Sequence, residues 1–112
     1  MIGKWLNYMA RLHDGVDAIL IADRHGTIEY SAMFSEQENG LIDEGFIGKN
    51  ILEVYPELTE ETSSHFRVMR TGKPVINEKQ VLTDFRGRRV MLVTSTFPLE
   101  DGGELIGTME TS

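Results

Sequence analysis

The spacing of apolar side chains changes from a helical to a strand period within residues 64–78. Before this point apolar or small residues recur every three or four positions, which places them on one face of a helix: Leu58, Thr62, His65, Phe66 and Met69. Thr59 suits an N-cap, and Gly72 and Pro74 are stop signals, so the pattern predicts a helix over 59–71. Such a one-sided helix must pack on another apolar face.

Strand patterns follow the helix and also precede it. The early run 18–23, the turn 24–27 and the alternating residues 28–30 predict a β-hairpin. Later runs with glycine-containing turns between them predict three more strands, at Val75–Phe85, Arg89–Pro98 and Glu104–Thr111. The sequence therefore predicts an α+β domain, in which a five-stranded antiparallel sheet carries helices on one face.

The first residues form a separate pattern. Apolar positions over 2–13 have helical spacing, and Asp14-Gly15 supplies a stop, so an amphipathic helix at 1–13 is expected to precede a domain at 14–112. Its apolar stripe either packs on the domain or joins two copies. In the second case the homodimer interface contains Ile2, Trp5, Leu6 and Met9.

Composition excludes several classes of function. The 112 residues suit one domain, and the net charge of −7 disfavours nucleic acid and anionic membrane as partners. No cysteine is present, which excludes thiolate metal sites and cysteine nucleophiles. The three histidines are too dispersed for a metal motif, and no catalytic motif occurs. We expect a cytoplasmic protein without enzymatic activity or metal, since no apolar run could span a membrane.

Motifs in a fixed order then carry a family resemblance. Residues 14–111 resemble a PAS domain, through segments 20–30, 47–51, 70–75 and 98–107. The sequences of segments 54–58, 66–80 and 95–99 resemble the N-terminal sensor of sigma-N-dependent transcriptional activators of the arginine-utilisation regulator type. That resemblance implies ATPase and DNA-binding domains C-terminal to this chain, which has no Gly-x-x-x-x-Gly-Lys-Ser/Thr motif.

The resemblance places a ligand cavity between the long helix and the sheet. PAS sequences often carry a polar residue at the position of Ala32, so the contact from there is either lost or replaced by Ser31. On the predicted strand Arg89–Pro98, the alternation through Met91 and Phe97 favours Ser95 over Thr94 as the inward residue. The predicted ligand-binding residues are Ser31, Ile51, Tyr55, His65, Phe66, Met69, Asn77, Met91, Ser95 and Met109. Plain core packing is the alternative for each apolar residue among them.

Three functions remain open at this stage. The first is a sensor of a small molecule, with an amino acid such as arginine or ornithine implied by the resemblance. The second is a dimerisation module whose cavity is filled by its own side chains. The third is a haem sensor with His65 as iron ligand, although a histidine bonded to the backbone is more common. The acid-rich segment 36–61, where Lys49 is the lone base, would attract a cationic ligand or is ordinary surface charge.

Overall fold

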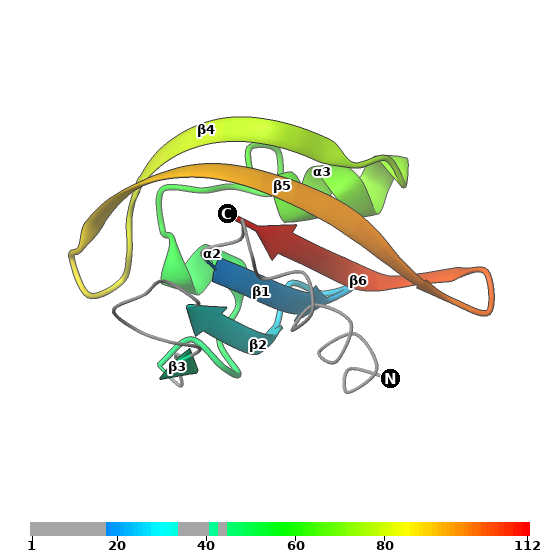
Figure 1. The fold of residues 1–112 in the computed structure, drawn as a ribbon, viewed down its shortest axis with the longest axis horizontal. Coiled ribbons are helices and arrows are strands. Elements are labelled where there is room, and N and C mark those ends of the chain that lie inside the picture. The colour runs from blue at the N-terminus through cyan, green and yellow to red at the C-terminus, as the bar shows by residue number, and fades with distance from the viewer. Residues whose placement is uncertain (1–17, 34–40, 43–44) are drawn as a thin grey trace.

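The computed structural model describes residues 18–33, 41–42 and 45–112, which form one antiparallel sheet and two helices (Figure 1). The strands lie in the order β3-β2-β1-β6-β5-β4. Their bounds are β1 Ala18–Asp23, β2 Ile28–Met33, β3 Leu41–Ile42, β4 Val75–Thr83, β5 Arg89–Asp101 and β6 Glu104–Thr111, and the helices are α2 Ile51–Val54 and α3 Ser64–Thr71. The five predicted strands are confirmed, with two-residue β3 added at one edge. The expected helix at 1–13, with Ile2, Trp5, Leu6 and Met9, lies outside the described residues.

The β1–β2 hairpin forms around a turn that needs glycine. Gly26 has φ +88°, and a Cβ added there would lie 2.7 Å from Phe66 Cζ. The Asp23 carboxylate accepts the backbone N–H groups of His25 and Thr27, which fixes the turn. The Asn50 side chain donates to the His25 carbonyl and also caps α2. The turn, α2 and the centre of the sheet are therefore held together.

Strand β5 is longer than its neighbour β6. Its second half pairs with β6 from Ser95↔Thr111 to Asp101↔Glu104, whereas residues 89–94 pair with β4 alone among the described strands. Figure 1 shows β4 and β5 arching over the rest of the sheet and curving down to their connecting turn at the left. A groove borders this part of β5, the start of β1 and the end of β6.

Helix α3 begins later than the periodicity predicts. The predicted cap Thr59 does not start it: the N–H groups of Thr59 and Thr62 instead donate to each other's hydroxyl oxygens, closing a separate turn. The helix begins at Ser64 and ends, as expected, at Gly72, whose φ is +69° and whose N–H donates to the Val68 carbonyl. The predicted helix start at Thr59 was therefore wrong, because threonine hydroxyls accept the hydrogen bonds of the backbone N–H groups there.

Apolar residues cover both faces of the sheet. On one face Leu20, Ala22 and Ile28 pack against the α2 region through Phe46, Ile51 and Val54. On the opposite face a second buried cluster contains Ile19, Ile21, Leu99 and Met109. Neighbouring residues of a strand therefore enter different cores, and alternation alone does not reveal which core faces the helices.

Candidate ligand-binding site

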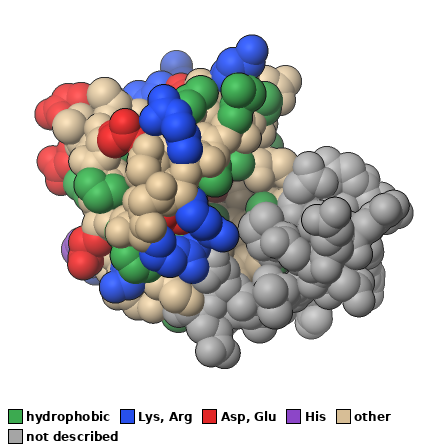
Figure 2. Space-filling model, turned by 90° about the vertical axis from the view of Figure 1, so that its left-hand side faces the viewer, with side chains coloured by type: hydrophobic (Ala, Val, Ile, Leu, Met, Phe, Trp, Pro, Cys, Tyr) green, Lys and Arg blue, Asp and Glu red, His purple; other side chains and the backbone are tan. Residues whose placement is uncertain are grey.

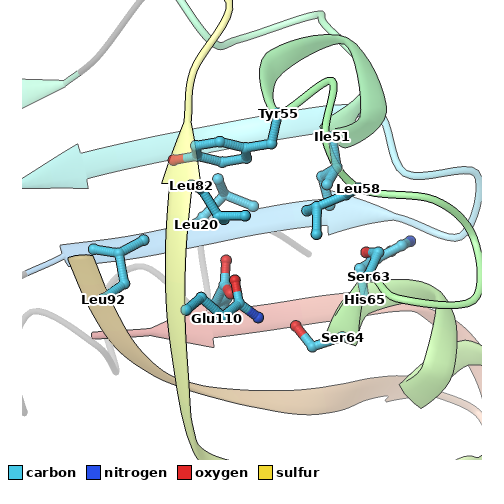
Figure 3. A pocket seen from close by; sticks show the side chains of 11 residues that line it. Leu20, Ile51, Tyr55, Leu58, Ser63, Ser64, His65, Leu82, Leu92 and Glu110 are labelled. Atoms are coloured by element: carbon cyan, nitrogen blue, oxygen red, sulfur yellow. The ribbon is translucent and has the colours of Figure 1, made fainter. Parts of the chain in front are cut away.

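A small cavity lies between α3, the α2 region and the sheet, where the resemblance places a ligand. Its volume is about 20 Å³, room for about one water molecule. Helix and turn residues form one wall and strands β1, β4, β5 and β6 form the other (Figure 3). The lining residues are Leu20, Ile51, Tyr55, Leu58, Ser63, Ser64, His65, Gln80, Leu82, Leu92 and Glu110.

His65 is the buried imidazole of this cavity, with 3% of its surface exposed. Its Nδ1 lies 2.6 Å from the Thr108 hydroxyl, so α3 is tied to β6, while Nε2 has no hydrogen-bond partner. Burial lowers the pKa of His65 to about 4, although the charge of Asp23 opposes that change. The imidazole is thus neutral at pH 7, with one ring nitrogen available to a guest molecule.

Glu110 brings a carboxyl group from β6 into the same cavity (Figure 3). Loss of hydration raises its pKa to about 7; the nearby Thr94 hydroxyl opposes the rise, and the charge of Glu78 adds to it. Thr94 is 1% exposed, and its oxygen makes no hydrogen bond of regular geometry. The Glu110 side chain is partly buried and has no cationic partner among the described residues, and the Thr94 hydroxyl beside it makes no hydrogen bond of good geometry.

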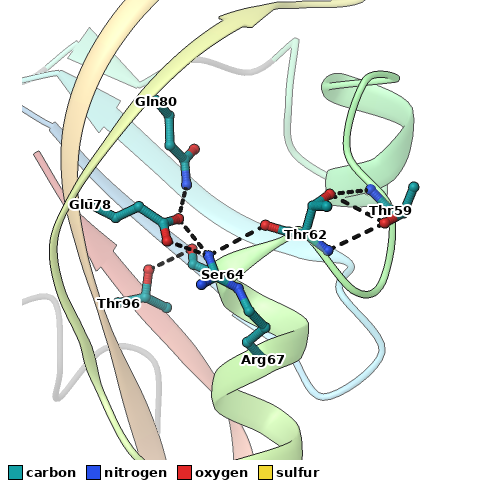
Figure 4. A network of polar contacts seen from close by, with 7 residues as sticks. All are labelled: Thr59, Thr62, Ser64, Arg67, Glu78, Gln80 and Thr96. Atoms are coloured by element: carbon teal, nitrogen blue, oxygen red, sulfur yellow. Dashed lines mark hydrogen bonds and ion pairs between the residues drawn. The ribbon is translucent and has the colours of Figure 1, made fainter.

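A polar network connects α3 with β4 next to this cavity (Figure 4). Arg67 Nη2 lies 2.5 Å from both carboxylate oxygens of Glu78, and Gln80 Nε2 donates to one of them. Burial acts to raise the pKa of Glu78, but the hydrogen bonds from Arg67 and Gln80 and the arginine charge outweigh it, so the pKa is lowered. The Arg67 side chain is 31% exposed. Ser64 continues the network to Thr96, 2.8 Å away.

A larger groove of about 680 Å³ adjoins the cavity. Four residues line both spaces, so they form the partition between them: Leu20, Tyr55, Leu92 and Glu110. Arg88 and Arg89, at the β4–β5 hairpin, also line the groove. Figure 2 shows Lys and Arg side chains gathered on the face that carries this hairpin, beside a hollow. The groove's volume falls within the usual range for small-molecule sites, whereas the cavity's does not.

The structure brings some predicted site residues to these spaces. Ile51, Tyr55 and His65 line the cavity, and Ser31, 7% exposed, lines the groove. Phe66 packs edge-on against His65 with ring centroids 4.7 Å apart, outside the cavity wall. Met69 is half-buried on α3 and likewise does not line it.

Four predicted residues are misplaced relative to the cavity. Met109 belongs to the opposite core, and Met91 is 72% exposed, although it borders the groove. Ser95 Oγ accepts the N–H of Asn77, which is exposed and has φ +53° beside an irregularity in β4. The choice of Ser95 over Thr94 as the inward residue was wrong, because Thr94 is the buried neighbour.

Sequence reasoning missed Glu110 and Gln80 as site residues, and it placed Thr94 on the outward face. All three lie on strands whose opposite faces are both partly apolar, so their inward direction had no clear signal. Acidic residues in strands are mostly exposed, so the sequence gives no reason to place Glu110 at a cavity. One available signal was the alternation Thr94, Thr96 opposite Glu110, a polar series within an apolar sheet.

The geometry limits what else the site could hold. Among the residues that the structure describes, no group of three histidine or acidic side chains is arranged as metal ligands. The enclosed volume near His65 Nε2 does not admit a porphyrin without large displacement of the wall. No helix within the described part of the chain is long and apolar enough to cross a membrane.

The family described as PAS fold matches residues 12–112. The chain belongs to the PAS family. This confirms the resemblance and the α+β fold predicted from the sequence. Transcriptional activator RocR of Bacillus subtilis is 25% identical over 99 residues, which cover 87% of this chain and 21% of RocR. The PAS domain described here thus spans about a fifth of that relative, a regulator of transcription.

Solved structures show the same PAS fold at low identity. The Vibrio cholerae VqmA dimer, described in connection with LuxR-type receptors, has a TM-score of 0.62 at 16% identity, covering 95% of this chain and 49% of VqmA. VqmA bound to DPO gives 0.64 at 15%, covering 95% and 56%. The PAS domain of an HTR-like protein from Haloarcula marismortui gives 0.52 at 15%, covering 97% and 93%.

Proposed function

We propose that this PAS domain is the sensor of a bacterial transcriptional regulator, that it binds a small molecule between α3 and the sheet, and that domains C-terminal to it read the resulting state. One observation carries the proposal: two buried polar atoms, His65 Nε2 and Thr94 Oγ1, make no hydrogen bond of good geometry, and their side chains border the same two spaces as Glu110. Buried polar groups are normally satisfied, and leaving one unpaired costs roughly 1–3 kcal/mol. A site that keeps several such groups is suited to a ligand that supplies their partners.

The adjoining groove supplies the room that the cavity lacks. A ligand of amino-acid size cannot enter 20 Å³, but it fits the 680 Å³ groove, with one end directed at the partition. A cationic amino acid such as arginine or ornithine agrees with the arginine-utilisation resemblance and with the acidic group in the partition. The acid-rich segment 36–61 is not needed for this role, since Glu110 lies outside it.

The competing function is a dimerisation module without a ligand. The small enclosed volume favours it, since the protein's own side chains nearly fill the space between α3 and the sheet. A homodimer is also compatible with sensing, and the proposed interface remains the apolar stripe containing Trp5 and Leu6. Trp5→Glu should then give folded monomer by light scattering, whereas a wild type that is monomeric at high micromolar concentration would remove this part of the proposal.

A thermal-shift screen tests the sensor function. Amino acids, polyamines and small heterocycles are added at up to tens of millimolar, and a true ligand raises the melting temperature by several degrees at saturation. Thr94→Val removes the unsatisfied hydroxyl at nearly constant volume and should reduce the shift. Ser95→Ala, one residue away on the opposite face, is the matched control and should keep it. If no compound shifts a cooperatively melting domain, the dimerisation module is the better interpretation.

A further inference from the structure

Glu110 occupies the one wall where the cavity and the groove meet. Its neighbours in that wall, Leu20, Tyr55 and Leu92, are apolar or aromatic, so its carboxyl is the acidic group available there to a molecule in the groove. The Thr94 hydroxyl beside it makes no hydrogen bond of good geometry, and His65, whose Nε2 is unpaired, lines the same cavity. These groups form a polar end to an otherwise largely apolar space.

We propose that Glu110 binds a protonated nitrogen group of the ligand, an ammonium or guanidinium, and loses its own proton to solvent when that group arrives. The inference rests on the proposed sensor function and deepens it by naming the specificity-determining residue. In the step, the carboxylic O–H bond breaks and the proton leaves to water, while the new carboxylate accepts N–H hydrogen bonds from the cation. Charge balances, because one cation enters as one proton leaves.

No protein cation within the described residues competes for this role. Arg67, the cation of the adjacent network, already binds both oxygens of Glu78. His65 on α3 is neutral at pH 7, since burial lowers its pKa to about 4. On β4, Gln80 donates to Glu78, and the Glu78 charge disfavours ionisation of Glu110. On β5, Thr94 offers only a hydroxyl. Glu110 is therefore an acid whose ionised form lacks a counterion until one is brought to it.

Two arginines that line the groove favour a second, anionic group on the same ligand. Arg88 and Arg89 line the groove. Arg88 Nε already contacts the Asp84 carboxylate at 3.2 Å, whereas Arg89 Nη1 contacts, among the described residues, the Thr83 hydroxyl at 3.3 Å and no carboxylate. Two guanidinium groups repel a simple cation and attract an anion. A dipolar molecule whose cationic group binds Glu110 is therefore attracted further if its anionic group is directed toward these arginines.

Calorimetric titration of three probes into the 112-residue chain tests this assignment. Arginine carries both charged groups, citrulline replaces the guanidinium by a neutral urea of similar shape, and agmatine lacks the carboxylate. Arginine should bind at least tenfold more tightly than citrulline, and more tightly than agmatine. Its affinity should increase roughly tenfold from pH 6 to pH 8, because the fraction of ionised Glu110 rises across that range. Titrations in buffers of different ionisation enthalpy should show proton release at pH 6.

Matched variants test the role of Glu110 separately from the proposed sensor function. Glu110→Gln should abolish the preference for arginine over citrulline, the pH dependence and the proton release. Glu104→Gln makes the same chemical change at an exposed position of the same strand and should leave all three intact. Arg89→Gln should weaken the binding of arginine but not the binding of agmatine, which has no carboxylate. Equal binding of arginine and citrulline, unchanged behaviour of Glu110→Gln, or no binding of either cation at tens of millimolar would overturn the inference. If a neutral compound still binds, the sensor function stands without it.

Discussion

Arg67 and Glu78 join the long helix to an outer strand, with one guanidinium nitrogen 2.5 Å from each carboxylate oxygen. The same Glu78 charge raises the pKa of Glu110. The helix contact and the cavity acid are therefore electrostatically linked through one residue, although Arg67 does not line the cavity.

Neutralising Glu78 should lower the pKa of Glu110. In Glu78→Gln a negative neighbour is removed and Arg67 loses its counterion, and both changes favour the ionised form of Glu110. The carbon-13 chemical shift of the Glu110 carboxyl, followed by NMR against pH, measures the change. Glu104→Gln, which removes a remote surface charge, should leave the Glu110 titration in place. A Glu110 pKa that stays constant or rises in Glu78→Gln would show that the two acids do not interact.

Glu110 should make the ligand-free domain less stable at alkaline pH. Its pKa is raised in the folded state from 4.5 to about 7, so its contribution to stability is present below pH 4.5 and is lost as pH rises through 7. Glu110→Gln should therefore be more stable than wild type at pH 8, by up to about 3 kcal/mol, and should show little gain at pH 4.5. Urea unfolding at both pH values measures this difference. Equal unfolding free energies at pH 8 would mean that solvent or a counterion already satisfies the carboxylate.

His65 should produce the opposite slope in nearly the same range. Its folded pKa is about 4 against 6.5, so the unfolded chain takes up a proton that the folded chain refuses, and stability falls as pH decreases from 6.5 toward 4. The change is of order 3 kcal/mol. It should offset the Glu110 effect in the wild type, giving a flat profile. His65→Gln, which can still hydrogen-bond Thr108, should become relatively more stable on acidification, whereas Glu110→Gln should become less stable. Parallel profiles for the two variants would contradict this.

Gly107 should not tolerate a side chain, because β1 passes directly over it. A Cβ at Gly107 would lie 2.2 Å from the Ala22 carbonyl oxygen, and the two strands pair there through Asp23↔Gly107. Gly107→Ala should cost about 2–4 kcal/mol in unfolding free energy. Gly103→Ala, in an open turn with φ +81°, should cost only about 1–2 kcal/mol. Chemical denaturation compares the two; a smaller loss at Gly107 than at Gly103 would show that the strands separate easily.

The fold could be predicted more completely than the site. Two pairs of neighbouring residues show the reason: Thr94 with Ser95, and Met109 with Glu110. Strand positions follow from turns such as the one at Gly87, φ +85°, and these were predicted correctly. The inward residue of each strand was not, since Thr94 and Glu110 were passed over for Ser95 and Met109. Both faces of this sheet bury apolar side chains, so an apolar residue at Met109 is correct for one core and wrong for the other. Periodicity shows that successive residues lie on opposite faces of the sheet, but it does not show which of the two faces packs against the helices.

The helix boundary failed for a different physical reason. Thr59 and Thr62 have the spacing of a helix start, and the apolar pattern runs through them from Leu58. Their hydroxyls nevertheless satisfy the local N–H groups in a closed turn, which removes the need for helical bonds there. Such competition between side chain and backbone depends on geometry that spacing does not contain.

Met109 and Glu110 are consecutive residues of β6, one in each core of the sheet. They share one backbone, which is hydrogen-bonded to β1 on one side and to β5 on the other. In the proposed sensor, a shift of the Glu110 carboxylate toward a bound cation would therefore also move Met109. The signal would then pass through β6 from the helix side of the sheet to the opposite apolar surface.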